Sequence, residues 1–300
     1  STRDNSIRVS AAQAIAQGIS EEGGLFVPVE LPHFDIEKIA SMASMNYIDR
    51  AKTVLKEYLT DFTEEELDYC VSGAYAAQKF SSPQIAPTVN VDGNKNILEL
   101  WHGPTCAFKD MALQLLPYLM TVSAKKTADG KTIVILVATS GDTGKAALEG
   151  FKNVDNTKIL VFYPVDGVSP MQKLQMTTQE GENVAVCAIN GNFDDAQSAV
   201  KSIFTNNDIK KELAKKNMMF SSANSINWGR LVPQIVYYFS TYCDLINMNK
   251  IKAILHNKVL LNLVEKNYPY EKIVVDQFTP PKNYYGYLSD VNKKVTNITF

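Results

Sequence analysis

The chain has 300 residues, of which 45% are hydrophobic and 21% charged, a composition typical of a globular protein of one or two domains. Thirty basic residues stand against 32 acidic ones, so the net charge of -2 provides no overall positive field for nucleic acid or a membrane surface. Four widely spaced cysteines and only three histidines disfavour a disulfide framework or a metal site and favour a cytoplasmic protein. No apolar run approaches the roughly 20 residues of a spanning helix.

The first 80 residues read as mostly helical. Residues 11–17 predict a short helix that stops at Gly18. Residues 23–28 read G-G-L-F-V-P, a turn that we expect to lead into an edge strand. Residues 35–58 and 63–80 carry helical periodicity, and T-E-E-E at the start of the second segment is a plausible N-terminal cap.

From residue 130 onward the pattern alternates between strands and helices. Continuous apolar runs predict strands at 131–139, 159–163 and 184–189, and the segments that follow them predict helices at 144–151, 171–178 and 195–204. Strands that are apolar throughout and separated by helices indicate a parallel sheet covered on both faces. We therefore expect an open, mostly parallel α/β sheet with flanking helices.

Lys109 lies in the segment W-H-G-P-T-C-A-F-K-D, among apolar and small residues. A lysine that is removed from water favours its neutral amine, the form that attacks an aldehyde to give a Schiff base. Most lysines in mixed sequence are solvated, so the residue types alone leave a structural role open.

The segment S-G-D-T-G at 140–144 joins a predicted strand to a predicted helix. Glycines allow a sharp turn there, and the helix N-terminus offers unpaired N–H groups to an anion. An ordinary turn capped by Asp142 or Thr143 is the alternative. The ending G-K-[ST] of a Walker A motif is absent.

A third polar segment, S-A-N-S-I-N-W-G-R at 222–230, also falls at a strand-to-helix junction. Amide, hydroxyl and guanidinium groups from Asn224, Ser225, Asn227 and Arg230 could converge there on a phosphate oxygen. The alternative is a capped helix whose arginine is solvated.

These three segments, together with the opening S-T-R and the turn G-G-L-F-V-P, resemble threonine synthase, a family of pyridoxal-phosphate enzymes. The resemblance covers residues 1–247. It implies the pyridoxal-phosphate fold type II, which is similar to the tryptophan synthase β subunit. It also implies a lyase of threonine biosynthesis that converts the small-molecule substrate O-phosphohomoserine to threonine and phosphate.

The resemblance also implies roles for particular residues. Lys109 would carry pyridoxal 5'-phosphate as a Schiff base and move protons at the substrate. The cofactor and the carboxylate end of the substrate would meet the loop residues Ser140, Gly141, Asp142, Thr143 and Gly144. The substrate would also contact Thr105, Asn224, Ser225, Asn227 and Arg230.

A different pyridoxal-phosphate lyase, such as a threonine dehydratase-like enzyme, remains an alternative because fold alone does not set the reaction. Dehydratases usually carry S-G-N-[HS]-[GA] in the loop, where this chain has Asp142 and Thr143. The loop therefore favours threonine synthase.

The resemblance ends near residue 247. The glycine-rich G-N-F-G loop that cradles the cofactor phosphate in the family is missing, and Gly191-Asn192-Phe193 is followed by two aspartates that would repel a phosphate. We therefore expect an incomplete cofactor domain, and an inactive truncated or chimeric protein is a further alternative.

Residues 248–300 resemble an interior piece of ribonuclease HIII, with N-K-x-K-A-x-L-H-N in a helix reaching residue 266 and a strand at 272–278 ending in D-Q-F. Asp276 would match a metal-binding carboxylate of that family. A single carboxylate does not make a two-metal site, so nuclease activity is not expected. The predicted division is a helical domain at 1–95, a partial α/β domain at 96–247 and this segment at 248–300.

Overall fold

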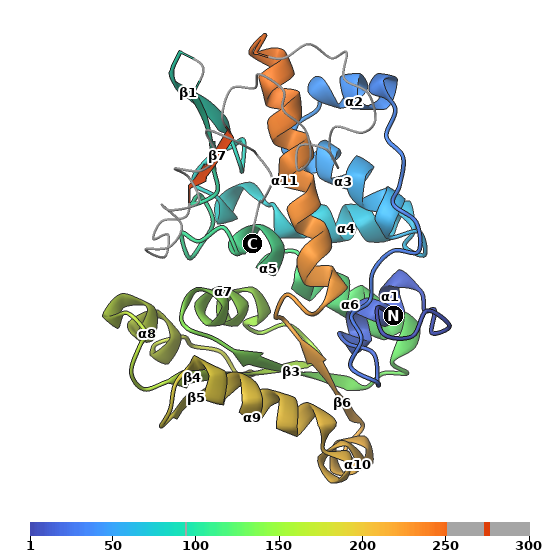
Figure 1. Cartoon of the computed structure of the whole chain (residues 1–300), viewed down its shortest axis with the longest axis vertical. Helices are drawn as coiled ribbons and strands as arrows, with labels where there is room; N and C mark the ends of the chain where they lie inside the picture. Colours follow the sequence, from blue (N-terminus) through green and yellow to red (C-terminus); the bar gives the residue numbers. More distant parts are fainter. Residues whose placement is uncertain (94, 251–272, 277–300) are drawn as a thin grey trace.

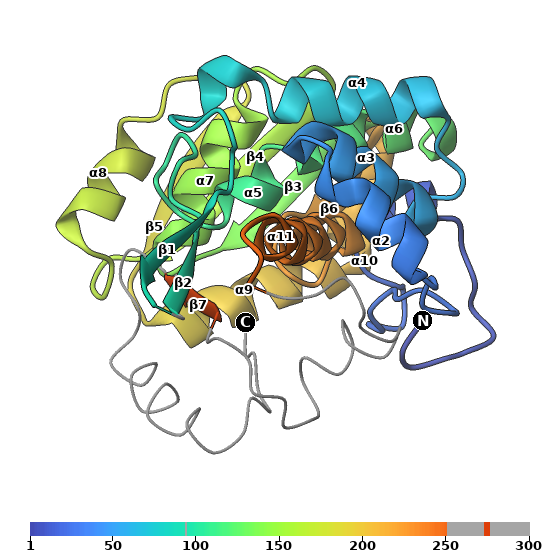
Figure 2. The same ribbon diagram turned by 90° about the horizontal axis from the view of Figure 1, so that it is seen from above.

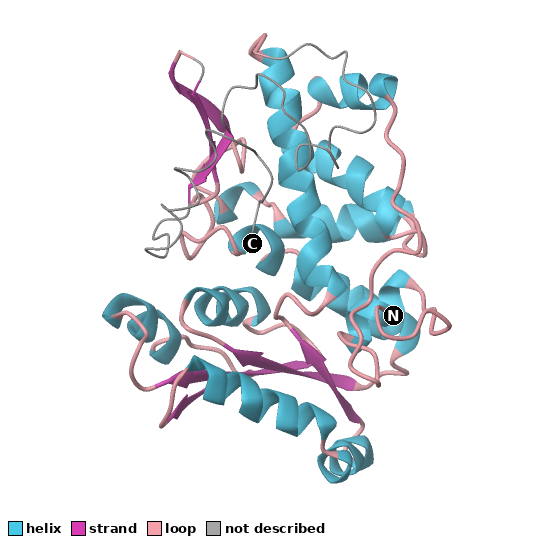
Figure 3. Cartoon of the chain, viewed as in Figure 1, coloured by secondary structure: helices cyan, strands magenta, loops and turns pink. Residues whose placement is uncertain are grey.

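The structure, a computed structural model, describes residues 1–93, 95–250 and 273–276. Figure 1 shows a helical layer stacked on a second layer built around a parallel sheet, and Figure 3 shows the same division by secondary structure. Among the described residues, no helix combines the length and the apolar character that crossing a lipid bilayer requires.

The N-terminal segment forms one helix and no strand. Helix α1 spans Ala11–Gln17; Ser10 caps its start, and Gly18, with φ 79°, ends it as predicted. The edge strand expected within residues 23–28 is wrong. Leu25 is hydrogen-bonded to Thr2 through both its N–H and its carbonyl, but no ladder continues from this pair.

Three helices make up most of the helical layer. α2 (Ile36–Ala43) and α3 (Tyr47–Tyr58) replace the single helix expected over 35–58, because Asn46 accepts a hydrogen bond from Asp49 N and starts a new helix there. α4 (Glu64–Ala74) begins with the capping box predicted at Thr63. It ends earlier than residue 80, and a 3-10 turn, η1 (Ala77–Lys79), follows.

A small sheet lies beside the helical layer. β1 (Thr88–Asp92) and β2 (Lys95–Glu99) form an antiparallel hairpin, and β7 (Ile273–Asp276) pairs with β2 in parallel. β7 confirms the strand expected within 272–278. The helix expected up to residue 266 lies outside the described residues, as does the rest of the segment 277–300.

The main sheet has the strand order β5-β4-β3-β6, with all neighbours parallel. Its strands are, in chain order, β3 (Thr132–Ala138), β4 (Thr157–Pro164), β5 (Val184–Ile189) and β6 (Met218–Ser222). The parallel α/β sheet predicted from the apolar runs is therefore confirmed.

Helices cover both faces of this sheet. α7 (Asp142–Phe151) lies on the face toward the helical layer, and α9 (Phe193–Thr205) lies on the opposite face (Figure 1). β3 serves both sides: Ile133, Ile135 and Val137 join the main core, whereas Leu136 and Ala138 pack with α9. α8 (Pro170–Thr177) and α10 (Asn207–Lys215) lie at opposite ends of the sheet.

Three further helices connect the layers. α5 (Asp110–Leu113) and α6 (Leu116–Thr127) precede the main sheet, and α11 (Trp228–Asn247) follows β6. α11 crosses from the sheet into the helical layer, where it is seen end-on among α2, α3 and α5 in Figure 2. It contains Pro233, which is buried.

A buried arginine ties α11 to the helical layer. Arg50 of α3 lies 2.6 Å from Asp244 Oδ1, donates to Ser240 Oγ at 2.9 Å, and donates to the backbone oxygen of Met42 at 3.0 Å. These contacts hold the C-terminal half of α11 against the helical layer.

Candidate active site

Lys109 is the residue directly before α5, and only 20% of its side chain is exposed. Burial lowers the pKa of its amine below the ordinary value. The carboxylate of Asp142 opposes this shift, whereas the positive charges of Arg230 and Lys145 add to it. The structure thus confirms that Lys109 is largely withdrawn from water, the condition that favours a nucleophilic amine.

Asp142 is the first residue of α7 and links two lysines. Its Oδ2 lies 3.7 Å from Lys109 Nζ, and its Oδ1 lies 3.5 Å from Lys145 Nζ. Gln172 of α8 donates a hydrogen bond from Nε2 to the same Oδ1. Lys145 and Gln172 could not be identified from the sequence, because both meet Asp142 only after α7 and α8 have packed together.

The loop at 140–144 takes a conformation that depends on glycine. Gly141 has φ 141°, and a Cβ atom there would lie 2.2 Å from the Oε1 of Gln172. Thr139 Oγ1 accepts hydrogen bonds from the N–H groups of Gly141 and Gly144, both at 2.9 Å. Gly141 is itself the N-cap of α7, so neither Asp142 nor Thr143 caps this helix as the alternative proposed.

The segment before Lys109 is held by a buried carboxylate. Asp110 Oδ1 accepts from Thr105 Oγ1 at 2.7 Å, and its Oδ2 accepts from Thr105 N at 2.8 Å. Burial raises the pKa of Asp110 to about 6, against the effect of these hydrogen bonds. A Cβ atom on Gly103 would lie 2.5 Å from Asp110 Cβ, so the turn packs closely. In this structure Thr105 shapes the turn, and its contact with substrate stays a prediction.

Two asparagines hold the junction between β6 and α11. Asn227 donates to the backbone oxygens of Ile15 at 3.0 Å and Ser222 at 2.9 Å. Asn224 donates to the carbonyl of Ala138, at the end of β3, at 3.1 Å. These bonds place the start of α11 beside the end of β3, and the substrate contacts of both residues stay predictions.

Arg230 lies in the first turn of α11 and is 2% exposed. Burial lowers the pKa of its guanidinium to about 10, while the interactions with Tyr237 and Asp110 raise it. Its Nε and Nη1 atoms have no hydrogen-bond partner among the described residues. The solvated arginine of the alternative interpretation is therefore wrong. Ser225, by contrast, is exposed, and its role stays a prediction.

These side chains form one charge cluster that consists of Lys109, Asp110, Asp142, Lys145 and Arg230. Three cations outnumber two carboxylates, and the buried guanidinium retains unused donors. A buried donor without a partner is costly, and an anion would satisfy it. A withdrawn amine beside a glycine turn at a helix N-terminus fits an aldehyde, and the spare donors of Arg230 fit a phosphate group.

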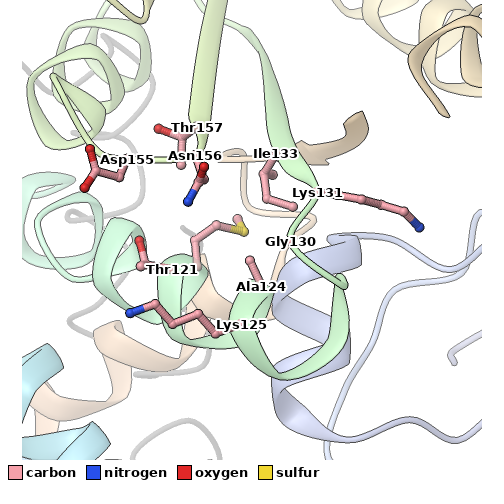
Figure 4. A pocket seen from close by; sticks show the side chains of 10 residues that line it. Thr121, Ala124, Lys125, Gly130, Lys131, Ile133, Asp155, Asn156 and Thr157 are labelled. Atoms are coloured by element: carbon pink, nitrogen blue, oxygen red, sulfur yellow. The ribbon is translucent and has the colours of Figure 1, made fainter. Parts of the chain in front are cut away.

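A separate small cavity lies at the other end of the main sheet (Figure 4). It has a volume of about 50 Å³ and is lined by residues that include Ile133 and Thr157, at the amino ends of β3 and β4. The charge cluster follows the carboxyl end of β3, where parallel α/β sheets bind their ligands. The cavity holds a few water molecules at most and is not the cofactor site.

Comparison with known proteins supports the interpretation of the N-terminal part. Residues 1–75 match the family model described as the N terminus of threonine synthase. The chain is 40% identical over 241 residues to threonine synthase of Pseudomonas aeruginosa, a match that covers 80% of this chain and 49% of that protein. It is 39% identical over 261 residues to threonine synthase-like 1 of Pongo abelii, covering 83% of this chain and 35% of that protein.

Solved structures show the same relationship. Threonine synthase from Brucella melitensis with bound pyridoxal phosphate superposes with a TM-score of 0.73 at 38% identity, covering 81% of this chain and 51% of that one. The yeast enzyme gives a TM-score of 0.72 at 34% identity and covers 82% and 50%. The pyridoxal-phosphate type of α/β fold is therefore confirmed. The chain spans about a third to a half of the length of the curated relatives it matches.

Proposed function

We propose that this chain is the lysine-bearing part of a threonine synthase, which uses pyridoxal phosphate to convert O-phosphohomoserine to threonine and phosphate. One observation carries the proposal: the amine of Lys109 lies largely buried beside Asp142, at the carboxyl end of β3. The similarity to a threonine synthase that binds pyridoxal phosphate supports the same conclusion.

Lys109 would hold the cofactor through its amine and would then carry protons to and from Cα and Cβ of the substrate. Pyridoxal phosphate, when bound, draws electrons away from the substrate carbons next to its imine. Asp142 lies 3.7 Å from the Lys109 amine and would keep this amine oriented. A lowered pKa of Lys109 suits this role, because an amine must lose its proton before it can act as a base.

Arg230 would bind the phosphate group of the substrate. Its Nε and Nη1 supply two unpartnered donors, and hydrogen bonds from a guanidinium to phosphate oxygens are strong because both groups are charged. Asn224 and Ser225 belong to the same junction and would assist. Ser140 to Gly144 would meet the carboxylate end of the substrate and the cofactor ring through the first turn of α7.

The test is an absorbance titration of the whole chain with pyridoxal phosphate. We expect the visible band of lysine-bound pyridoxal phosphate with the native chain and its loss in Lys109→Ala, because alanine has no amine to condense with the aldehyde. Lys201→Met, on the exposed surface of α9, serves as the control and should keep the band. An unchanged band in Lys109→Ala would contradict the assignment.

The substrate is tested separately. Release of phosphate from O-phosphohomoserine supports threonine synthase, whereas deamination of threonine without any phosphate release would support the dehydratase-like alternative.

A further inference from the structure

Lys145 occupies a position that is unfavourable for a cation. It is 9% exposed and lies in the first turns of α7, four residues after the N-cap Gly141. The N-terminus of a helix carries a partial positive charge, and a buried ammonium group loses its hydration. A lysine in this place needs a compensating anion, and Asp142 Oδ1 at 3.5 Å is that anion.

The two oxygens of Asp142 have different partners. Lys145 and Gln172 approach Oδ1, whereas Lys109 approaches Oδ2 at 3.7 Å. Charge-assisted N–H···O bonds are usually about 2.7–2.9 Å long, and both distances from a lysine Nζ to Asp142 exceed this range. Neither lysine therefore forms a tight ion pair with Asp142. The carboxylate is held between two ammonium groups.

We propose that Lys145 is a positioning residue that holds Oδ1 of Asp142 and thereby withholds part of that carboxylate from Lys109. This inference rests on the proposed function, in which Lys109 is the reactive amine. Lys145 itself touches neither cofactor nor substrate in this role; it acts through Asp142.

Among the described residues, the charged groups that act on the Lys109 amine come from α7 and α11. α7 supplies Asp142 and Lys145, and α11 supplies Arg230, whereas Asp110 of α5 turns its carboxylate to Thr105. Removal of the charge on Lys145 takes away a repulsion and also leaves Asp142 free to pair with Lys109. Both effects stabilise the protonated amine and therefore raise the pKa of Lys109.

The experiment measures the pH dependence of one reaction at Lys109 in the chain without cofactor. Formaldehyde and cyanoborohydride methylate neutral amines, and mass spectrometry of the peptide gives the rate at Lys109 from pH 6 to 10. The variants are Lys145→Met, which keeps the length of the side chain, and Lys145→Arg, which keeps the charge. Lys201→Met on α9 is the matched control.

We expect the midpoint of the rate profile to rise by about one pH unit in Lys145→Met, a shift of the size expected from one nearby charge. Lys145→Arg and Lys201→Met should keep the native midpoint. A purely structural role would lower the melting temperature of Lys145→Met without moving the midpoint, and that result would overturn the inference.

The two proposals fail separately. If the native chain gives no absorbance band with pyridoxal phosphate and the midpoint still rises in Lys145→Met, the proposed function fails and the electrostatic role of Lys145 stands. If the band forms and the midpoint stays fixed, only the role of Lys145 is refuted.

Discussion

At the scale of single residues, buried charges dominate the candidate site. Lys109 and Arg230 both have lowered pKa values because burial penalises their charged forms, while Asp110 has a raised pKa for the same reason. Perturbed pKa values gathered in one place are typical of functional sites, because catalysis needs groups that change protonation near neutral pH. The cluster is therefore kept at a cost in stability.

The raised pKa of Asp110 predicts that the free energy of unfolding depends on pH. Its pKa is about 6 in the folded chain, against an ordinary value of 3.8, so the folded state holds the proton more tightly. The contribution of Asp110 to stability is then present below pH 3.8 and is lost as the pH rises through about 6. The loss is roughly 3 kcal/mol, as an order of magnitude for a shift of this size.

Urea unfolding of native chain and Asp110→Asn at several pH values between 4 and 7 checks this prediction. Asparagine does not titrate, so the free energy of unfolding of the variant should fall less than that of the native chain as the pH rises from 4 to 7. Asp155→Asn, at an exposed position, is the control and should follow the native profile. Parallel profiles for native chain and Asp110→Asn would contradict the raised pKa.

At the scale of elements, the turn from β3 into α7 depends on one threonine. Thr139 is 1% exposed, and its hydroxyl accepts from two backbone N–H groups of the loop that carries Asp142. Thr139→Val keeps the shape and removes the acceptor, which leaves both N–H groups unpaired. We expect a loss of about 1–3 kcal/mol in the free energy of unfolding.

Chemical denaturation measures this loss, and Thr139→Ser is the matched control because it keeps the hydroxyl. Thr139→Ser should retain most of the stability and of the uptake of pyridoxal phosphate, whereas Thr139→Val should lower both. Equal stability of the two variants would show that the hydroxyl does not hold the loop.

The elements also show what the sequence could predict. The parallel strands were predictable because runs such as 132–138 are apolar on both faces, and α1 was predictable because Gly18 stops it. The hairpin of β1 and β2 was not predicted, although β1 alternates polar and apolar residues and Asp92-Gly93 is a turn signal, because both strands are only five residues long and β2 does not alternate. The break before α3 had a signal, Asn46 followed by Asp49, that the helical periodicity hid.

Only part of the candidate site could be predicted from the sequence. Lys109, the loop at 140–144 and Arg230 were predicted from the resemblance of their segments to threonine synthase, because their residue types alone left structural roles open. Lys145 and Gln172 do not stand out in the sequence, because a lysine or glutamine on a helix is ordinary until the packing of α7 and α8 brings both to Asp142.

At the scale of the whole molecule, Arg50 joins the helical layer to the helix that delivers Arg230. Its guanidinium contacts Asp244 and Ser240 of α11 from a side chain that is only 6% exposed. Arg50→Met fills a similar volume and leaves Asp244 without its cation. A loss of about 3 kcal/mol is expected, as for the breaking of a buried ion pair.

Thermal unfolding followed by circular dichroism measures that loss. Lys52→Met is the control. Lys52 lies on α3 like Arg50 but is more exposed, and it pairs with Asp68 of α4, so its replacement should lower the free energy of unfolding by less than about 1 kcal/mol. A similar cost for both variants would show that the connection between the layers does not depend on Arg50.

The proline within α11 affects the first turn of that helix, which carries Arg230. Pro233 has no N–H to give to the carbonyl of Gly229, one turn earlier, so the short stretch that carries Arg230 is secured by fewer bonds than the remainder of the helix. The first turn of α11 is held instead by Asn227, which accepts a hydrogen bond from Gly229 N and donates to the backbone oxygens of Ile15 and Ser222, so this polar anchor keeps the guanidinium of Arg230 in a fixed position.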